Sequence, residues 1–220
     1  VMDRTKDRPF VTKELEPTNT WNLWLAIIST LALYATYQVS NLEATLYLFA
    51  GIFTYGIVYT VWLKRRTWMN IVIGGLSGSF AILVGSAATG NALSTAPLIL
   101  SAVLFLWTPP HFWALAISFK DEYSKAGIPM LPVVYGDRIT SQAIFWHTLV
   151  LVILSWSLFF YGMSWIYLTF AVLGGGYFLY CSFLLLKEQT KALARKTFFS
   201  SIIHLGLLLL GAMFDAMIFA

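Results

Sequence analysis

The sequence predicts an all-α protein, a polytopic bundle of membrane-spanning helices, and three observations support this fold class. The 220 residues are 59% hydrophobic and only 11% charged, whereas soluble domains carry roughly 25% charged residues. Apolar runs of the length that a transmembrane helix needs, about 20 residues, recur along the whole chain. All 14 Lys and Arg residues fall into short stretches between these runs, as the positive-inside rule expects.

Seven transmembrane helices are predicted, one from each apolar run. In chain order they cover residues 21–40, 44–63, 69–90, 95–117, 141–161, 164–186 and 198–219. None shows the polar stripe that would face water in a soluble helical protein, so a soluble core is disfavoured. The turns near Ser40–Glu43, Gly90–Ser94 and Tyr161–Ser164 contain no Lys or Arg. We therefore expect a single transmembrane domain over 1–220, with every basic residue on one side of the membrane.

The basic residues are interpreted as a cytoplasmic membrane face and not as a nucleic-acid surface. They are Arg4, Lys6, Arg8, Lys13, then Lys64, Arg65, Arg66, then Lys120, Lys125, Arg138, and finally Lys187, Lys191, Arg195 and Lys196. Basic groups directly beyond apolar spans set topology and attract anionic lipid headgroups, which accounts for the net charge of +4. The single cysteine, Cys181, lies within a span, which excludes a disulfide framework.

Most of the acidic residues share that face. Of the ten Asp and Glu residues, only Glu43 and Asp215 lie away from the basic stretches. Charges of both signs at one mouth of a helix bundle suit an anionic substrate bridged by a metal ion. Carriers, in contrast, place ionisable groups near the membrane midplane, and here the spans are almost free of charge. The pattern favours an enzyme with an amphipathic substrate over a transporter.

The strongest local signal is the run L-W-T-P-P-H-F-W-A-L-A-I at 106–117. A proline within a helix removes a backbone donor and clashes with the preceding turn. Pro109 and Pro110 are therefore predicted to interrupt the helix in mid-membrane, with carbonyl groups left unpaired. His111 follows directly, at the point where such a kink would open space.

A long loop over 118–140 is predicted to follow, and it contains K-D-E-Y-S-K-A-G-I-P-M-L-P-V. Asp121 and Lys125 are four residues apart, so on a helix they share one face. They are candidates for binding a metal or an anionic group. The structural alternative is an ion pair between them worth about 0.2–0.5 kcal/mol.

These two runs resemble the protohaem IX farnesyltransferase family, a branch of the UbiA-type intramembrane prenyltransferases. The resemblance is carried by W-T-P-P-H-F-W at 107–113 and A-G-I-P-M-L-P at 126–132. Three further segments extend it over essentially the whole chain: M-x-R-T-x-x-R-P at 2–9, Y-T-x-x-L-K-R-x-T-x-x-N-I-x-x-G-G-x-x-G at 59–78, and a final-helix pattern over 198–215 that ends in aspartate.

The resemblance implies nine spans, and a first aspartate-rich motif, N-x-x-x-D-x-x-x-D, directly before the position of Met2. The sequence starts with Val1 and not with methionine. We therefore expect that the first two spans and the first metal-binding aspartates are missing from this chain, which would then be inactive by itself.

The resemblance also implies a reaction. A farnesyl group passes from farnesyl diphosphate to the vinyl group of haem B, water adds, and haem O and diphosphate result. Mg²⁺ bridging the diphosphate is the expected cofactor, and haem B is a substrate. The expected setting is the inner membrane of a bacterium, with the basic loops and the mouth of the site on the cytoplasmic side. Haem A synthase or cytochrome oxidase assembly proteins are candidate partners; nucleic acid is not.

The resemblance assigns roles to particular residues in this chain. The expected catalytic residues are Asp121, Arg4, Arg8, Lys64 and Arg65. The expected substrate-binding residues are His111, Asn70, Tyr123 and Lys125. The expected metal ligands are Asp121 and Glu122, because Mg²⁺ prefers carboxylate oxygens together with water and substrate phosphates.

Structural alternatives remain for most of these assignments. Arg4 and Arg8, like the cluster Lys64–Arg66, would serve as topology anchors. A lone helical histidine such as His111 is usually a hydrogen-bonding core residue, and Asn70 would equally bridge two helices. Two other functions also compete: a related prenyltransferase acting on a quinone precursor or chlorophyll-type acceptor, and a non-catalytic transporter or assembly factor.

Overall fold

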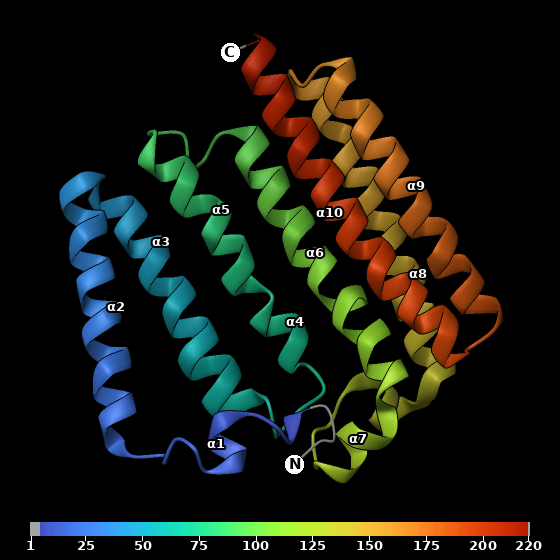
Figure 1. Cartoon of the computed structure of the whole chain (residues 1–220). Coiled ribbons are helices and arrows are strands. Elements are labelled where there is room, and N and C mark those ends of the chain that lie inside the picture. The colour runs from blue at the N-terminus through green and yellow to red at the C-terminus, as the bar shows by residue number, and fades with distance from the viewer. Residues whose placement is uncertain (1–4, 220) are drawn as a thin grey trace.

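The computed structural model describes residues 5–219 as a bundle of long helices, in which successive helices run in opposite directions (Figure 1). No strand occurs in this range, so the predicted all-α class is confirmed. The α-helices are α1 (Pro9–Thr12), α2 (Asn19–Val39), α3 (Leu42–Phe53), α4 (Asn70–Gly74), α5 (Leu76–Ala88), α6 (Thr95–Ser118), α7 (Lys120–Lys125), α8 (Leu131–Ser157), α9 (Trp165–Lys187) and α10 (Lys191–Phe219). A π-helix, η2 (Thr54–Leu63), continues α3, and a 3-10 turn, η3 (Leu158–Tyr161), follows α8.

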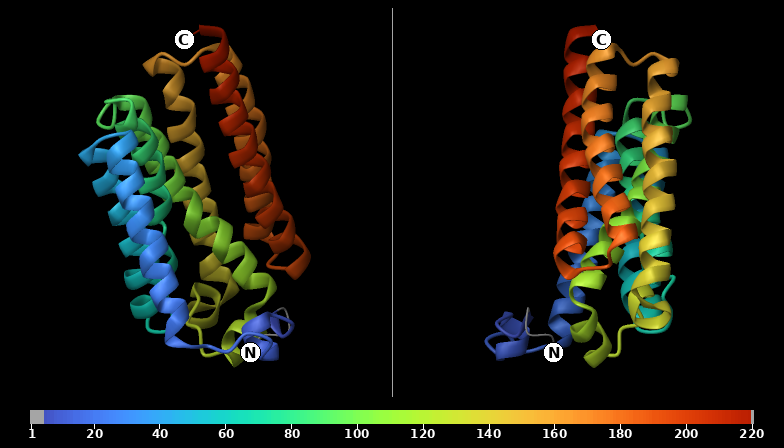
Figure 2. Two further views of the ribbon diagram at one scale, coloured as in Figure 1. Left: turned by 60° about the vertical axis from the view of Figure 1, so that its left-hand side comes forward. Right: turned by 90° about the vertical axis from the view of Figure 1, so that its right-hand side faces the viewer.

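Six helical segments within the described chain are long and apolar enough to cross a membrane. They are α3 with η2, α4 with α5, α6, α8 with η3, α9, and α10. The remaining predicted span, 21–40, forms α2, which has 21 residues but is less apolar because Asn22, Gln38 and several hydroxyl side chains interrupt it. No residue of α2 is buried, and its main neighbour is α3 at the edge of the bundle (Figure 2). The predicted polytopic membrane bundle is thus confirmed.

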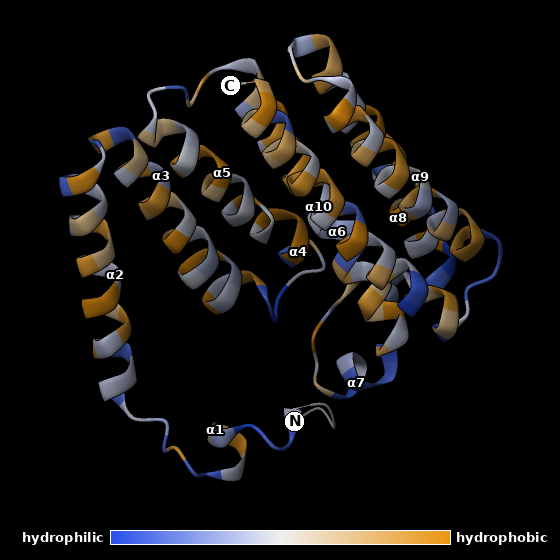
Figure 3. Cartoon of the chain, turned by 45° about the horizontal axis from the view of Figure 1, so that its top comes forward, coloured by the Kyte–Doolittle hydropathy of each residue, from blue (hydrophilic) through white to orange (hydrophobic). Residues whose placement is uncertain are grey.

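The hydrophilic segments gather at one end of the bundle, as the charge pattern predicts (Figure 3). This end holds α1, the loop between η2 and α4, and α7, and the turn between α9 and α10 faces the same way. The C-terminus of α10 lies at the opposite end (Figure 1). The basic end is therefore a single surface, where residues far apart in the sequence meet.

The predicted loop over 118–140 is largely helical in the structure, so its assignment as a loop was wrong. Most of it forms α7 and the first turns of α8. Pro132 stands in the first turn of α8, where proline fits because its missing N–H has no helical partner. Gly136, with φ 82° and ψ 170°, then bends α8. The polar composition of 118–140 had suggested a loop and gave no sign of these helices.

The predicted break at Pro109 and Pro110 is also wrong. α6 continues through both prolines to Ser118, and both are buried against neighbouring helices. Membrane helices tolerate proline where neighbouring helices and side chains satisfy the freed backbone groups. Here Trp107 Nε1 donates a hydrogen bond to the backbone oxygen of Ser201 on α10, at 2.8 Å, and so ties α6 to its neighbour beside the prolines.

The tightest packing is between α9 and α10. A Cβ atom added at Gly174 would lie 3.0 Å from the Cα atom of His204, so only glycine permits this approach. Small residues are the usual means by which membrane helices come close. The core of this half includes Leu151, Tyr167 and Phe178. Gly175 packs closely in the same way, because an added Cβ atom would lie 3.1 Å from Cγ1 of Val152 on α8. The half formed by α8, α9 and α10 packs against α6, and the cavities lie on the other side, along α3–α6.

Asp215 joins α10 to the start of α9, at the end of the bundle away from the basic residues. Its carboxylate accepts hydrogen bonds from the backbone N–H of Ser164, at 2.9 Å, and from the Ser164 hydroxyl, at the start of α9. We predict that Asp215→Ala lowers the free energy of unfolding by about 1–3 kcal/mol, because it leaves two half-buried donors of Ser164 without their acceptor. Thermal unfolding in detergent would show a lower midpoint. Asp215→Asn keeps an acceptor and should lose less; equal midpoints for wild type and Asp215→Ala would contradict this role.

Candidate active site

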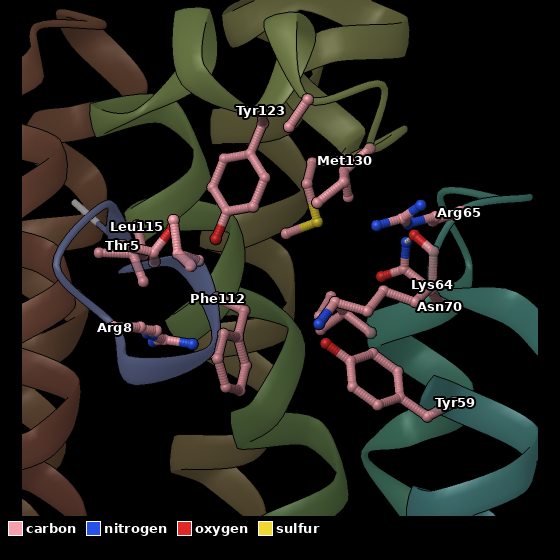
Figure 4. A pocket seen from close by; sticks show the side chains of 14 residues that line it. Thr5, Arg8, Tyr59, Lys64, Arg65, Asn70, Phe112, Leu115, Tyr123 and Met130 are labelled. Atoms are coloured by element: carbon pink, nitrogen blue, oxygen red, sulfur yellow. Dashed lines mark hydrogen bonds between the residues drawn. The ribbon is translucent and has the colours of Figure 1, made fainter. Parts of the chain in front are cut away.

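A cavity of about 440 Å³ opens at the basic end of the bundle (Figure 4). Its walls come from the N-terminal segment, η2, α4, α6, α7 and the loop after α7. Five of the predicted site residues line it: Arg8, Lys64, Arg65, Asn70 and Tyr123. The fold thus brings together residues from four separate stretches of the sequence, as the predicted assignments require.

The lining carries positive charge. Arg8 approaches from the N-terminal segment, and Lys64 and Arg65 lie on the opposite side of the cavity (Figure 4). None of the described lining residues is acidic. Arginine binds phosphate oxygens in a bidentate manner and lysine binds them as a point charge. The cavity is therefore suited to an anion that bears several oxygens, such as a diphosphate.

The π-helix η2 positions Lys64 and Tyr59 together. In this segment the backbone N–H of Lys64 bonds to the carbonyl of Tyr59, five residues earlier, at 2.9 Å. The Lys64 Nζ atom lies 5.9 Å from the centre of the Tyr59 ring. In a regular α-helix residues five apart point away from each other, whereas the wider π turn brings them to one face. Figure 4 shows the Tyr59 and Tyr123 hydroxyls pointing into the cavity.

Asn70 holds the loop that follows η2. Its side-chain amide donates to the carbonyls of Thr67, at 2.7 Å, and Lys64, at 3.4 Å. Asn70 is 1% exposed, and its side-chain oxygen accepts no hydrogen bond within the described chain. A buried acceptor without a donor is costly. Asn70 therefore anchors the loop with its amide, while its buried oxygen has no donor among the described residues.

A second cavity, of about 310 Å³, continues from the first into the bundle. Tyr59, Ile71 and Phe112 line both cavities and form the junction between them. The second cavity is lined by uncharged side chains of η2, α4, α5 and α6. A molecule with an anionic head and an apolar tail would thus find a basic site at the mouth and an apolar site behind it.

The predicted metal ligands do not lie in this cavity. Asp121, Glu122 and Lys125 belong to α7 but do not line it. Asp121 forms an ion pair with Lys191 of α10, at 2.9 Å, and not with Lys125 as the alternative held. Glu122 has one carboxylate oxygen that is buried and without a partner among the described residues. Arg4 lies outside the described residues, so its position stays a prediction.

Asp121 and Glu122 are not gathered with a third metal-binding side chain among the described residues. The charge of Asp121 is compensated by Lys191, and no group of three or more His, Cys, Asp or Glu side chains among residues 5–219 is arranged to hold a metal ion. A Mg²⁺ ion needs carboxylate oxygens that are free to coordinate it beside the phosphates of the substrate. The magnesium requirement therefore stays a prediction, and no chemical step below depends on it.

The ion pair with Lys191 has a measurable electrostatic consequence. The hydrogen bond and charge of Lys191 hold the pKa of Asp121 below its usual value of 3.8. The pair therefore stabilises the folded state above that pH and loses its effect as the pH falls through the lowered pKa. We predict that Lys191→Ala raises the Asp121 pKa, measured by carboxyl NMR titration, and that Lys191→Arg does not. An unchanged pKa in Lys191→Ala would show that the pair does not form in solution.

His111 is buried beside the second cavity. Its ring stacks on Trp107, with ring centres 4.2 Å apart, and on Phe198, at 4.5 Å. Its Nδ1 atom lies 2.7 Å from the Ser201 hydroxyl, which itself donates to the Phe198 carbonyl at 2.6 Å. The His111 Nδ1 atom and the Ser201 hydroxyl therefore share one hydrogen bond that holds the ring in place. His111 does not line either cavity, and its substrate role stays a prediction.

Tyr59 was not predicted as a site residue, although it stands in the motif at 59–78. The spacing Y-x-x-x-x-K at 59–64 was the available signal, but on an ordinary α-helix it places Tyr59 and Lys64 on opposite faces. Ile71 and Phe112 were missed because apolar residues in membrane spans carry no distinguishing sign. Only the meeting of three helices shows that they line a junction.

A basic cavity that adjoins an uncharged one inside a membrane-helix bundle is the kind of site that an intramembrane enzyme with an amphipathic substrate would need. The model of the UbiA prenyltransferase family matches residues 1–203, and the chain belongs to this family.

Similar curated proteins carry one name. Protoheme IX farnesyltransferase 2 of Paramagnetospirillum magneticum is 48% identical, over 99% of this chain and 76% of that protein. Protoheme IX farnesyltransferase of an Acidovorax species is 43% identical, over 97% of this chain and 70% of that protein. The protein of that name from Gloeobacter violaceus is 41% identical, over 98% of this chain and 71% of its own length. No solved structure matches the chain.

Proposed function

We propose that this protein transfers a farnesyl group from farnesyl diphosphate to the vinyl group of haem B, giving haem O and diphosphate. The observation that carries the proposal is the pair of joined cavities, one basic and one uncharged. Membership of the UbiA prenyltransferase family and the shared name of the similar proteins support the same reaction.

The cavities match the two parts of a prenyl diphosphate. The diphosphate would lie among Arg8, Lys64 and Arg65, and the tail would pass the junction into the second cavity. Burying a fifteen-carbon chain at about 0.8 kcal/mol per carbon contributes on the order of 10 kcal/mol of binding free energy. That energy holds the reactive carbon at the boundary between the charged and the apolar cavity.

The basic residues would assist the departure of diphosphate. The bond between C1 of the farnesyl chain and oxygen breaks, and its electron pair leaves with the diphosphate. Positive groups already in place where this charge develops lower the barrier without having to reorganise. The haem vinyl group then forms a carbon–carbon bond to C1, and water adds to the resulting cation with loss of a proton. The product is the hydroxyethylfarnesyl haem, and the donor's other product is diphosphate.

The enclosure of the second cavity would protect the allylic cation. A water molecule that reached C1 before haem would yield free farnesol. Tyr59, Ile71 and Phe112 enclose the junction with aromatic and aliphatic surface, and Ile71 is only 4% exposed. Water exclusion of this kind prevents side reactions of reactive intermediates.

Following the positive-inside rule, we propose that this end of the bundle lies on the cytoplasmic side of a bacterial inner membrane.

The test is product analysis with the protein expressed from its complete reading frame. Membranes containing it would be incubated with haem B, farnesyl diphosphate and Mg²⁺, and the extracted haem weighed by mass spectrometry. The expected product is haem B plus one farnesyl group and one hydroxyl group, and EDTA is expected to abolish it. Unchanged haem B from folded protein would overturn the proposed acceptor.

A further inference from the structure

A third cavity extends the path beyond the second. It measures about 370 Å³ and lies between α3 and α5. Tyr55, Ser77 and Gly78 line both the second and the third cavity, so they form a second junction. The second cavity thus ends at Gly78, and the third cavity adjoins it on the other side of this residue.

At this second junction the side chain of Leu104 comes close to Gly78. A Cβ atom added at Gly78 would lie 3.4 Å from Cδ2 and 3.5 Å from Cγ of Leu104, which lines the second cavity from α6. Ordinary van der Waals contact would thus be reached with a single methyl group. Any larger side chain at position 78 would project into the path and meet Leu104.

The helices on either side of this junction are held at a defined spacing. Next to Gly78, the Ser79 hydroxyl donates to the backbone oxygen of Ser101, at 2.9 Å, and the Ser101 hydroxyl donates to that of Ser79, at 3.3 Å. Both serines are buried, so these bonds between α5 and α6 are shielded from competing water. The distance between Gly78 and Leu104 is therefore a fixed dimension of the fold.

We propose that Gly78 and Leu104 determine the length of isoprenoid chain that the protein accepts. This inference rests on the proposed prenyl transfer. A chain whose end reaches Gly78 fills the second cavity. A shorter chain leaves apolar surface unburied, and a longer chain meets Gly78 and Leu104, which stand too close together for a chain to pass between them. Each unburied or excluded isoprene unit loses the free energy of burying five carbons.

The experiment compares chain lengths in one reaction. Geranyl, farnesyl and geranylgeranyl diphosphates, with ten, fifteen and twenty carbons, would compete for haem B, and the prenylated haems would be quantified by mass. Gly78→Leu narrows the junction, and we expect the ten- to fifteen-carbon product ratio to rise at least tenfold. Leu104→Ala widens it, and we expect the twenty- to fifteen-carbon ratio to rise at least tenfold. Gly85→Leu on the same helix, where a Cβ meets nothing within 4 Å, should change neither ratio.

Two further measurements separate this inference from the proposed reaction. Equilibrium binding of unreactive thiolodiphosphates with the same three chain lengths reports the preference even if no haem is prenylated. Gly78→Ala, which needs only ordinary contact with Leu104, provides a milder variant if Gly78→Leu fails to fold. Product ratios and dissociation constants that stay unchanged in folded Gly78→Ala and Leu104→Ala would overturn the role of the pair. Wild-type protein that binds the analogues but leaves haem B unmodified would overturn the reaction alone.

Discussion

Lys64→Ala is expected to lower kcat/KM for prenyl transfer by about 10²–10³-fold, the usual cost of removing one fixed group that stabilises charge in a transition state. Lys64 lies at the end of η2, faces the basic cavity, and is held beside Tyr59 by the π-helix. The loss should appear mainly in kcat, because charge on the diphosphate increases as the bond to carbon breaks. Steady-state kinetics with farnesyl diphosphate and haem B would measure it.

The matched control for this substitution is Lys187→Ala. Lys187 belongs to the same basic end, but its Nζ atom lies over the Phe183 ring, 4.7 Å from its centre, and it does not line the cavity. If the basic end acted only through membrane topology, the two lysines would be equivalent and both variants would change orientation or insertion alike. Equal kcat/KM values for the two variants would therefore refute the role of Lys64 in the reaction.

Gly74→Ala is expected to lower kcat/KM about 10–100-fold, because a misplacement of about 1 Å in a substrate-positioning group can cost 10²-fold. A Cβ atom at position 74 would lie 2.8 Å from Cδ2 of Tyr59, closer than real Cβ atoms approach, and 3.1 Å from Cγ of the same ring. The ring would have to move, and with it the junction between the first two cavities. Kinetics would show the effect on the reaction, and thermal unfolding would show whether the fold survives.

Gly56→Ala is the control for Gly74→Ala, since a Cβ at Gly56 meets nothing within 4 Å. Tyr59→Phe separates two contributions, because it keeps the ring at the junction and removes only the hydroxyl. A small effect of Tyr59→Phe combined with a large effect of Gly74→Ala would assign the role to the position of the ring. Wild-type kinetics in a folded Gly74→Ala variant would contradict it.

Much of the candidate site could be predicted because its chemistry is visible in residue types. Arg8, Lys64, Arg65, Asn70 and Tyr123 stand in polar stretches, and all five line the first cavity. Charged and amide groups beside membrane spans are conspicuous, since burying them in lipid is expensive.

The acidic part of the site was less predictable. Sequence spacing paired Asp121 with Lys125 on one helical face, but the partner of Asp121 is Lys191, which lies 70 positions further along the chain. Local spacing limits which groups can meet within one helix. It contains no information on which distant helix end comes closer.

Hydropathy and the distribution of charge were enough to establish an all-helical membrane bundle with one basic end, because lipid demands apolar spans whose backbone bonds are satisfied internally. They did not reveal that α6 passes through Pro109 and Pro110 without ending, or that α3 continues as a π-helix. Nor did they show the cavities, because the walls consist of apolar residues like those that face lipid. Such features arise from contacts between helices. Only the packed structure therefore reveals the junction at Tyr59, Ile71 and Phe112 and the close approach of Leu104 to Gly78.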